Sequence, residues 1–308
     1  MDALIVCLWI CAGACAATWL ASLITDEHSW VDRIWSIIPV VYVAVFTAAA
    51  DFADTRLNVL AVLVLLWGAR LTFNFARRGG YAPGGEDYRW AILRARLPRW
   101  QFQLFNLLFI TVYQNIILLL IALPAYTALT HPSPFGVLDA VLAVVFLGLL
   151  AGETVADQQQ WDFHRRKHAA IAAGEPPQSR FLRTGLFRYS RHPNYFFEQA
   201  QWWVVFGFGA AAAGSVLQWT VIGPVLLTAL FIGSTMFTES ITLSRYPEYA
   251  GYRAVTSPIV PWPPRRSGAA DRVDVPPPEI GGGTGGLPWL VGPVPVSEDA
   301  EPGAPPAR

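Results

Sequence analysis

Seven apolar segments constrain the fold of this chain more than any other feature. They cover about residues 3–24, 34–50, 57–75, 101–126, 135–156, 196–213 and 217–237. A membrane-spanning helix needs about 20 apolar residues, with a lower limit near 17. Only 14% of the 308 residues are charged, against about 25% in an ordinary soluble domain. The sequence therefore predicts an all-α, polytopic membrane helical bundle with about seven transmembrane helices.

Positive charge is concentrated in alternate loops. The loops near 77–99 and 165–191, together with the chain after 237, contain most of the arginines, whereas loops 51–56, 127–134 and 214–216 contain one cation, Arg56. Because cytoplasmic loops are enriched in Lys and Arg, the N-terminus is predicted outside and the C-terminus in the cytoplasm. We expect an integral protein of a bacterial inner (plasma) membrane. The formal net charge of zero does not indicate a nucleic-acid partner.

The composition changes after about Pro263. The following residues, which include VDVPPPEIGGGTGG and PGAPPAR, are rich in Pro and Gly and have no sustained apolar periodicity. Such a segment buries too little apolar surface to offset the entropy of ordering. The sequence therefore predicts two parts, a transmembrane domain over 1–263 and a disordered tail over 264–308.

The stretch from Arg180 to Glu198, RFLRTGLFRYSRHPNYFFE, places four arginines and a His-Pro-Asn-Tyr turn between two apolar segments. Pro193 fixes its own φ and disfavours the helical region for His192, so the chain turns there. Asn194 stands where the N-cap of the next helix is expected. This charge suits an anionic cofactor, and a cationic membrane-facing loop followed by a capped helix explains the same residues.

Metal and nucleotide motifs are not found in a usable context. His164 and His168 have the spacing of a metal-binding pair, but three cations stand between them where a zinc motif has its glutamate. The three cysteines lie in the first apolar segment and are expected to pack there. The glycine-rich GGGTGG lies in the tail and follows no predicted strand. We therefore expect no metal site, and a nucleotide would be held by the bundle and its loops.

Polar residues within and beside the apolar segments indicate where the bundle is functional. Arg70, Asn74 and Arg77 fall at helical spacing near the end of the third segment, so they face the bundle interior or extend to the interface. Residues 157–168 are expected to continue the fifth helix out of the membrane. Together with residues 26–35, 77–90 and 239–262, they are expected to converge with the Arg180–Glu198 stretch at one end of the bundle.

Several of these motifs together resemble a known family. LRTGLFRYSRHPNYFFE is followed by E-x5-R-x-P-x-Y-x2-Y-R-x2-T-S-x2-V-P-W, and is preceded by VDRIW, WGARLTFNFARRGGY and GGEDYRW. This combination resembles the steroid 5-alpha-reductase C-terminal domain, and more narrowly the bacterial group catalogued as domain of unknown function 1295. The resemblance covers about residues 25 to 263. Isoprenylcysteine carboxyl methyltransferases carry similar RHPxY turns.

The resemblance implies a seven-helix membrane fold that holds NADPH in its cytoplasmic half. Asn194 and Glu198 match an Asn-x3-Glu that family reductases place against the nicotinamide. Arg180 matches an arginine on the nucleotide portion, and Asp157 matches an acid at the end of the fifth helix. The predicted cofactor-binding residues are Asp157, Arg180, Arg188, His192, Asn194, Tyr195 and Glu198.

The catalytic acid follows less directly from the resemblance. The steroid enzymes polarise the substrate carbonyl with a Glu–Tyr pair on the second and third helices, and that pair is not found here at matching positions. Asp32 is the nearest acid and Tyr42 the nearest tyrosine. These two are the candidate catalytic residues.

The leading functional prediction is an integral membrane, NADPH-dependent reductase of a C=C bond conjugated to a carbonyl. Its substrate would be a lipophilic, steroid-like or lipid molecule that enters from the bilayer. Membrane lipids are the other expected partners. One alternative is a membrane methyltransferase that uses S-adenosylmethionine. A second is a non-enzymatic membrane lipid-binding protein whose arginines meet anionic headgroups. The oligomeric state is left open.

Overall fold

The computed structural model describes residues 2–176 and 179–265, and over these residues the chain is helical without a β-strand. An isolated β-bridge joins Ser190 to Ser257. The predicted tail lies outside the described residues except for positions 264 and 265.

The helices follow one another along the chain with short connections. The first half contains α1 (Ala3–Thr25), α2 (Trp30–Trp35), α3 (Ile38–Ala49), α4 (Thr55–Arg77), α5 (Tyr88–Arg96), α6 (Arg99–Phe105), the π-helix η1 (Asn106–Tyr113) and α7 (Gln114–Thr130). The second half contains α8 (Val137–Ala172), η2 (Gly185–Arg188), α9 (Pro193–Ala213), η3 (Trp219–Val221), α10 (Ile222–Arg245) and α11 (Tyr249–Val255).

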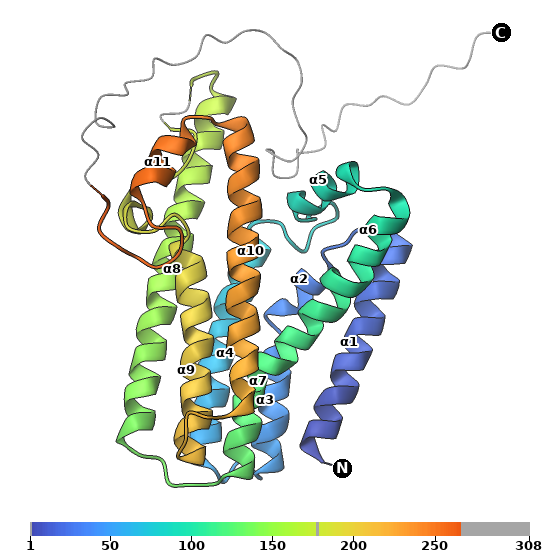
Figure 1. The fold of residues 1–308 in the computed structure, drawn as a ribbon, viewed down its shortest axis with the longest axis vertical. Coiled ribbons are helices and arrows are strands. Elements are labelled where there is room, and N and C mark those ends of the chain that lie inside the picture. The colour runs from blue at the N-terminus through green and yellow to red at the C-terminus, as the bar shows by residue number, and fades with distance from the viewer. Residues whose placement is uncertain (1, 177–178, 266–308) are drawn as a thin grey trace, which may run out of the picture.

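Within the described ranges, six helical units are long and apolar enough to cross a membrane, and they indicate an integral membrane protein. They are Ala3–Thr25, Trp30–Ala49, Thr55–Arg77, Arg99–Thr130, Val137–Ala172 and Trp219–Arg245. The predicted sixth segment forms α9, which is not among the six because Glu198, Gln199 and Gln201 lower the hydropathy of its first half. It nevertheless runs along α8 and α10 within the bundle (Figure 1). All seven predicted segments are therefore helical.

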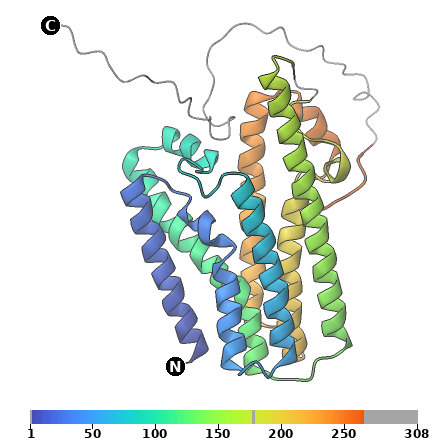
Figure 2. The same ribbon diagram turned by 180° about the vertical axis from the view of Figure 1, so that it is seen from behind.

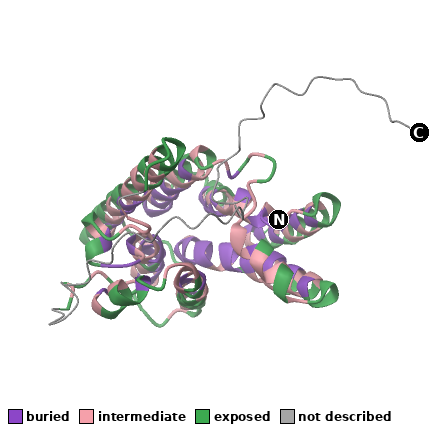
Figure 3. Cartoon of the chain, turned by 90° about the horizontal axis from the view of Figure 1, so that it is seen from above, coloured by how far each residue is buried: buried purple, intermediate pink, exposed green. Residues whose placement is uncertain are grey.

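The helices form one elongated bundle around α7. This helix packs against α9, α3, α10, α1 and α4, while α8 packs against α9 and α4. In Figure 1, α8, α9 and α10 stand side by side, and α1 and α6 lean away from them at the upper end. The buried residues face the middle of the bundle, and exposed residues cover its outside (Figure 3).

Two glycines allow neighbouring helices to approach α7 closely. A Cβ atom on Gly209 of α9 would lie 2.8 Å from the backbone oxygen of Pro124. A Cβ atom on Gly223 of α10 would lie 2.4 Å from the backbone oxygen of Leu120. Small residues at helix crossings are the usual means of close packing in membranes. These glycines therefore allow α9 and α10 to pack closely against the centre of the bundle.

The two ends of the bundle differ in charge. The N-terminus and the short loops before α4, α8 and α10 lie at the lower end, whereas α5, α11 and the cationic loops lie at the upper end (Figures 1 and 2). At the lower end, Arg56 forms a buried ion pair with Asp139 through contacts of 2.7 and 2.9 Å. The predicted separation of the cationic loops to one end is confirmed.

Candidate functional site

Arg70, on α4, lies at the centre of a buried polar cluster between α4, α8 and α9. Its Nη1 donates to Oδ2 of Asp157 at 2.6 Å, and its Nη2 donates to Oε1 of Glu153 at 2.7 Å. The same Nη2 lies 3.5 Å from Oε2 of Glu198. All three acids are buried. We call these four residues the Arg70 cluster.

Two tryptophans bind the carboxylate of Glu198. The indole Nε1 of Trp67, on α4, donates to Oε2 at 2.9 Å, and the indole Nε1 of Trp202 donates to Oε1 at 3.3 Å. The two indole rings meet edge to face, with centroids 4.8 Å apart. Buried indole N–H groups require an acceptor, and here one carboxylate serves both. Glu198 is therefore fixed from two helices.

The other two acids are fixed in a similar way. Asn74 Nδ2 donates to Oδ2 of Asp157 at 2.7 Å, and the guanidinium of Arg78 lies 3.4 Å from Oδ1. Gln201 Nε2 donates to Oε2 of Glu153 at 2.7 Å. Each carboxylate of the Arg70 cluster thus contacts a cation and a neutral donor.

Helical spacing explains why these residues share one place. Glu153 and Asp157 are four residues apart on α8, and Arg70 and Asn74 are four apart on α4, so each pair projects from one face of its helix. Glu198 lies one turn into α9, on the face that packs against α4 and α8. Packing three ordinary helical faces together is sufficient to build the cluster.

The cluster contains more acidic than basic groups. Three carboxylates surround the single buried guanidinium of Arg70, and the nearby Arg78 has a partly exposed side chain. Ionisable groups within membrane spans are costly and mark functional sites by default. Breaking such a buried arrangement exposes the remaining charges to an apolar surrounding. We therefore regard the Arg70 cluster as the candidate functional site.

A second ion-pair group lies at the upper end of the bundle, around Glu239 of α10. Arg191 donates to both of its oxygens, at 2.6 and 3.1 Å, and His192 Nε2 lies 3.2 Å from Oε1. Tyr249 of α11 also donates to Oε1, at 3.4 Å. Burial raises the pKa of the Tyr249 hydroxyl, and the charge of Glu239 adds to this effect. This group ties the start of α9 to α10 and α11.

The turn before α9 differs from its prediction by two residues. The helix begins at Pro193, with His192 as the N-cap residue, so Asn194 occupies the second helical position. The prediction that Asn194 is the N-cap was wrong, because proline is well suited to the first position of a helix, where its missing N–H is not needed. Asn194 is half-buried on the first turn, one turn before Glu198.

The remaining predicted cofactor residues surround this turn. Arg180 pairs with Glu248 at 3.5 Å. Tyr195 stacks on the His192 ring with centroids 5.1 Å apart. Arg188 is exposed and forms no ion pair within the described part of the chain. In the structure, Asp157 and Glu198 thus both contact Arg70. Arg180 and Arg188 instead lie in the segment that precedes α9.

The loops predicted to converge do so at the upper end of the bundle. Arg89, on the first turn of α5, pairs with the N-cap residue Asp87 at 2.6 Å and also donates to the hydroxyl of Ser234 on α10. Burial acts to lower the pKa of Arg89, but the charge and the hydrogen bonds of Asp87, together with the charges of Tyr195 and Asp32, outweigh burial and raise that pKa. Lys167, on the extended part of α8, donates to the backbone oxygen of Arg180 at 2.9 Å. The cationic loops therefore form one connected cap.

The two candidate catalytic residues lie apart from each other. Asp32, on α2, is half-buried near the charges of Asp87 and Arg89 at the cap. Tyr42, on α3, is fully buried in the core, and its hydroxyl has no hydrogen-bond partner among the described residues. Neither forms a hydrogen bond or an ion pair with the Arg70 cluster in the described part of the chain.

Sequence reasoning did not assign a role to several residues of the site. The sequence could have identified Glu153 as a candidate functional residue, because it is an acid within a predicted membrane span. Arg70 was noted for its spacing, but its three acidic partners follow only from helix packing. Trp67, Gln201 and Trp202 look like ordinary residues of apolar helices. Their contacts with Glu198 and Glu153 identify them as part of the site.

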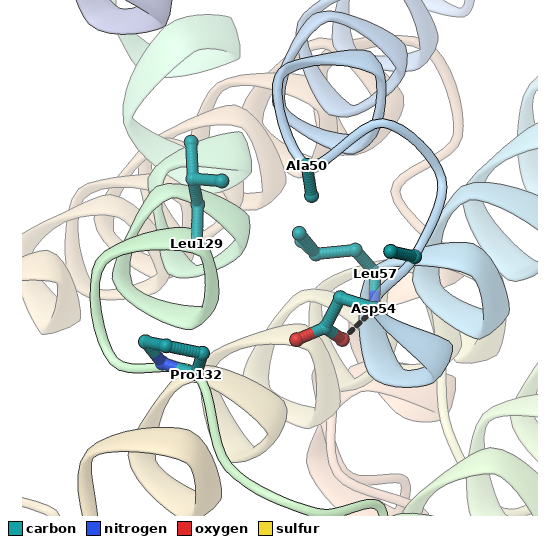
Figure 4. Close-up of a pocket in the computed structure, with 6 residues that line it drawn as sticks. Ala50, Asp54, Leu57, Leu129 and Pro132 are labelled. Atoms are coloured by element: carbon teal, nitrogen blue, oxygen red, sulfur yellow. Dashed lines mark hydrogen bonds between the residues drawn. The ribbon is translucent and has the colours of Figure 1, made fainter.

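Open cavities lie away from the Arg70 cluster. One of about 340 Å³ lies at the lower end and is lined by Ala50, Ala53, Asp54, Leu57, Leu129 and Pro132 (Figure 4). Its single acid, Asp54, accepts a hydrogen bond from the backbone nitrogen of Leu57 and caps α4. A second, of about 260 Å³, lies near α11. The side chains of the Arg70 cluster are instead joined by the hydrogen bonds described above.

Comparison with known proteins places the chain in a family. Residues 18–257 match the family described as "Protein of unknown function (DUF1295)". An uncharacterized protein of Schizosaccharomyces pombe (strain 972 / ATCC 24843), C594.04c, is 38% identical over 250 residues, a match that covers 76% of this chain and 73% of the relative. No solved structure matches the chain. The narrower of the two predicted resemblances is thus confirmed. The chain belongs to the DUF1295 family, and the match extends over α2 to α11 and so includes every residue of the Arg70 cluster.

Proposed function

We propose that this protein is an NADPH-dependent membrane reductase of a C=C bond conjugated to a carbonyl in a lipophilic substrate. One observation carries the proposal. Asp157 and Glu198, the two acids that the resemblance to steroid 5-alpha-reductases assigns to the cofactor, both contact the guanidinium of Arg70. They are 41 residues apart in the sequence and come from different helices, so their meeting supports a shared site.

The donors and acceptors of the cluster fit a nicotinamide carboxamide. Nε of Arg70 and Oε1 of Gln201 are buried and have no hydrogen-bond partner among the described residues. A carboxamide offers a carbonyl oxygen and an NH₂ group, which match one unused donor and one unused acceptor. The exposed Arg188 and the partly exposed Arg180 are suited to the phosphates, since guanidinium groups bind phosphate with paired hydrogen bonds.

The residues of the site have distinct tasks in this proposal. When bound, NADPH supplies the hydride that is delivered to the β-carbon of the substrate. The excess of carboxylates over guanidinium charge in the Arg70 cluster favours a neighbouring group that becomes more positive during the reaction. Trp67 and Trp202 hold Glu198 in place and exclude water. Asp32 and Tyr42 stay the candidates for stabilising the substrate oxygen by hydrogen bonding or proton donation.

A methyltransferase that uses S-adenosylmethionine is the second candidate. The observation in its favour is the same excess of buried carboxylates, because a sulfonium is cationic and would be attracted to it. The arginines of the loop before α9 favour the reductase, because S-adenosylmethionine carries no phosphate for them to bind. In either case we propose that the cationic end of the bundle faces the cytoplasm, where both cofactors are made available.

The reaction itself can be tested with a labelled cofactor. Purified, detergent-solubilised protein is incubated with NADPH that carries deuterium at the transferable position and with a panel of steroid and long-chain enones. The proposal expects deuterium at the β-carbon of a reduced product, analysed by mass spectrometry. A parallel incubation uses S-adenosylmethionine with an isotopically labelled methyl group. Label transfer from that cofactor, with none from NADPH, would reject the reductase in favour of methyl transfer.

A further inference from the structure

A cavity of about 260 Å³ lies between the start of α9, α11 and residues 256–265. Its wall contains three arginines, Arg191, Arg253 and Arg265, together with the aromatic ring of Trp262 and the backbone of the segment after α11. None of these lining residues belongs to the Arg70 cluster. The cavity is therefore separate from the Arg70 cluster.

The charge of the cavity is positive. Among the described residues, Glu239 is the one acid that forms ion pairs with its arginines, and it is shared among Arg191 at 2.6 Å, Arg253 at 3.4 Å and His192 at 3.2 Å. Arg265 is exposed and forms no ion pair within the described part of the chain. The side chain of Arg253 is 51% exposed, so its guanidinium is only partly engaged by Glu239. Arg253 and Arg265 are thus available to an anion.

The cavity lies at the upper end of the bundle, beside the start of α9. The segment after α11 runs back beside the turn before α9 (Figure 1), because the backbone nitrogens of Arg191 and His192 donate to the oxygens of Ser257 and Pro258 at 2.8 and 3.1 Å. The backbone nitrogen of Trp262 donates to the oxygen of Tyr189 at 2.9 Å. These bonds hold the cavity level with the first turn of α9.

Two large apolar side chains of the segment after α11 are exposed. Trp262 is 69% exposed and Val260 is 57% exposed, although the backbone around them is fixed by hydrogen bonds. Tryptophan is enriched at the level of lipid headgroups, where its ring meets acyl chains and its N–H meets water. Arginines at the same level attract anionic lipids. Apolar and cationic side chains are therefore exposed in the same segment, and they suit the acyl chains and the phosphate of a phospholipid.

We infer that this cavity binds the phosphate headgroup of an anionic phospholipid. Arg253 and Arg265 pair with the phosphate oxygens, and Trp262 and Val260 contact the acyl chains at the interface. Arg191 does not contact the lipid directly but is held by Glu239 and by the backbone oxygens of Arg253 and Thr256, so it keeps the cavity in shape. The bound lipid would fasten the segment after α11 to the membrane surface.

The test is lipid binding to the full-length protein in detergent, measured by native mass spectrometry. Phosphatidylglycerol and phosphatidylcholine are titrated separately into wild type, Arg265→Gln, Trp262→Ala and the control Arg166→Gln, which removes an exposed arginine of α8. We expect phosphatidylglycerol to bind more tightly than phosphatidylcholine. Its affinity should fall about fivefold in Arg265→Gln, the effect of one arginine near an anionic surface, and stay unchanged in the control.

The variants also separate the lipid from soluble phosphates. Trp262→Ala should weaken both lipids, because the interfacial contact does not depend on headgroup charge. Equal phosphatidylglycerol binding by Arg265→Gln and Arg166→Gln would overturn the inference. Displacement of the lipid from wild type by inorganic phosphate or by NADPH would overturn it as well, since the site would then belong to a soluble anion. Neither result depends on whether the protein is a reductase.

Discussion

The indole Nε1 of Trp67 donates a 2.9 Å hydrogen bond to Oε2 of Glu198 and so joins the middle of α4 to the second turn of α9. Both side chains are buried, and Arg70 lies one turn further along α4, 3.5 Å from the same oxygen. One carboxylate oxygen therefore receives a neutral and a charged donor from a single helix. This geometry makes Glu198 a fixed acceptor, as a cofactor-orienting residue has to be.

Arg70→Met tests whether the cluster depends on one counter-charge. The substitution leaves three buried carboxylates without their common partner, so we expect the free energy of unfolding to fall by about 3–5 kcal/mol. The midpoint of thermal unfolding in detergent measures the change. Arg70→Lys retains the charge but not the paired donors and should lose less, and the exposed Arg166→Gln should have no effect. A stable Arg70→Met protein would show that the cluster is not held by this charge.

Tyr42→Phe separates packing from catalysis at a candidate residue. The hydroxyl of Tyr42 has no hydrogen-bond partner in the described part of the chain, so its removal should change the free energy of unfolding by less than about 1 kcal/mol. If Tyr42 donates the proton, NADPH-dependent turnover should fall by about 10²–10⁴ while the unfolding midpoint stays the same. Unchanged turnover would remove Tyr42 from the mechanism and leave Asp32.

We expect Glu27, in the connection before α2, to make the stability of the protein depend on pH. Glu27 accepts a hydrogen bond from the backbone nitrogen of Gly84 at 2.8 Å and from Arg33 at 2.6 Å, and these contacts lower its pKa in the folded protein from 4.5. Its stabilisation is therefore complete above pH 4.5 and is lost as the pH falls through the lowered pKa. Glu27→Gln should unfold at a lower temperature at pH 7 and show a smaller loss on acidification than wild type. Identical acid profiles for the two proteins would contradict this.

Much of the fold followed from the sequence because apolar length and charge placement constrain a membrane chain strongly. The seven apolar segments are the helices of the bundle, and residues 157–168 continue α8, as predicted. The start of α9 was misplaced by two residues because the preference of Pro193 for the first helical position outweighs the capping preference of Asn194.

The site was predicted only in part, because its residues are brought together by packing between helices. Asp157 and Glu198 were selected by resemblance, and the sequence contains no sign that both contact Arg70. Trp67 is one of many aromatic residues in apolar segments, and its role depends on the direction of a single N–H group. Roles of this kind follow from tertiary contacts and not from spacing along a helix.

The most direct test of the central claim is cofactor binding, measured by the thermal unfolding of detergent-solubilised wild type, Asn194→Ala, Glu198→Gln and the control Arg166→Gln. At 100 times its dissociation constant, a ligand stabilises the native state by about 2.7 kcal/mol. The account predicts that NADPH raises the unfolding midpoint of wild type and of the control, that both site variants lose this shift, and that S-adenosylmethionine gives none. Stabilisation of wild type by S-adenosylmethionine alone, or an NADPH shift that persists in both site variants, would contradict it.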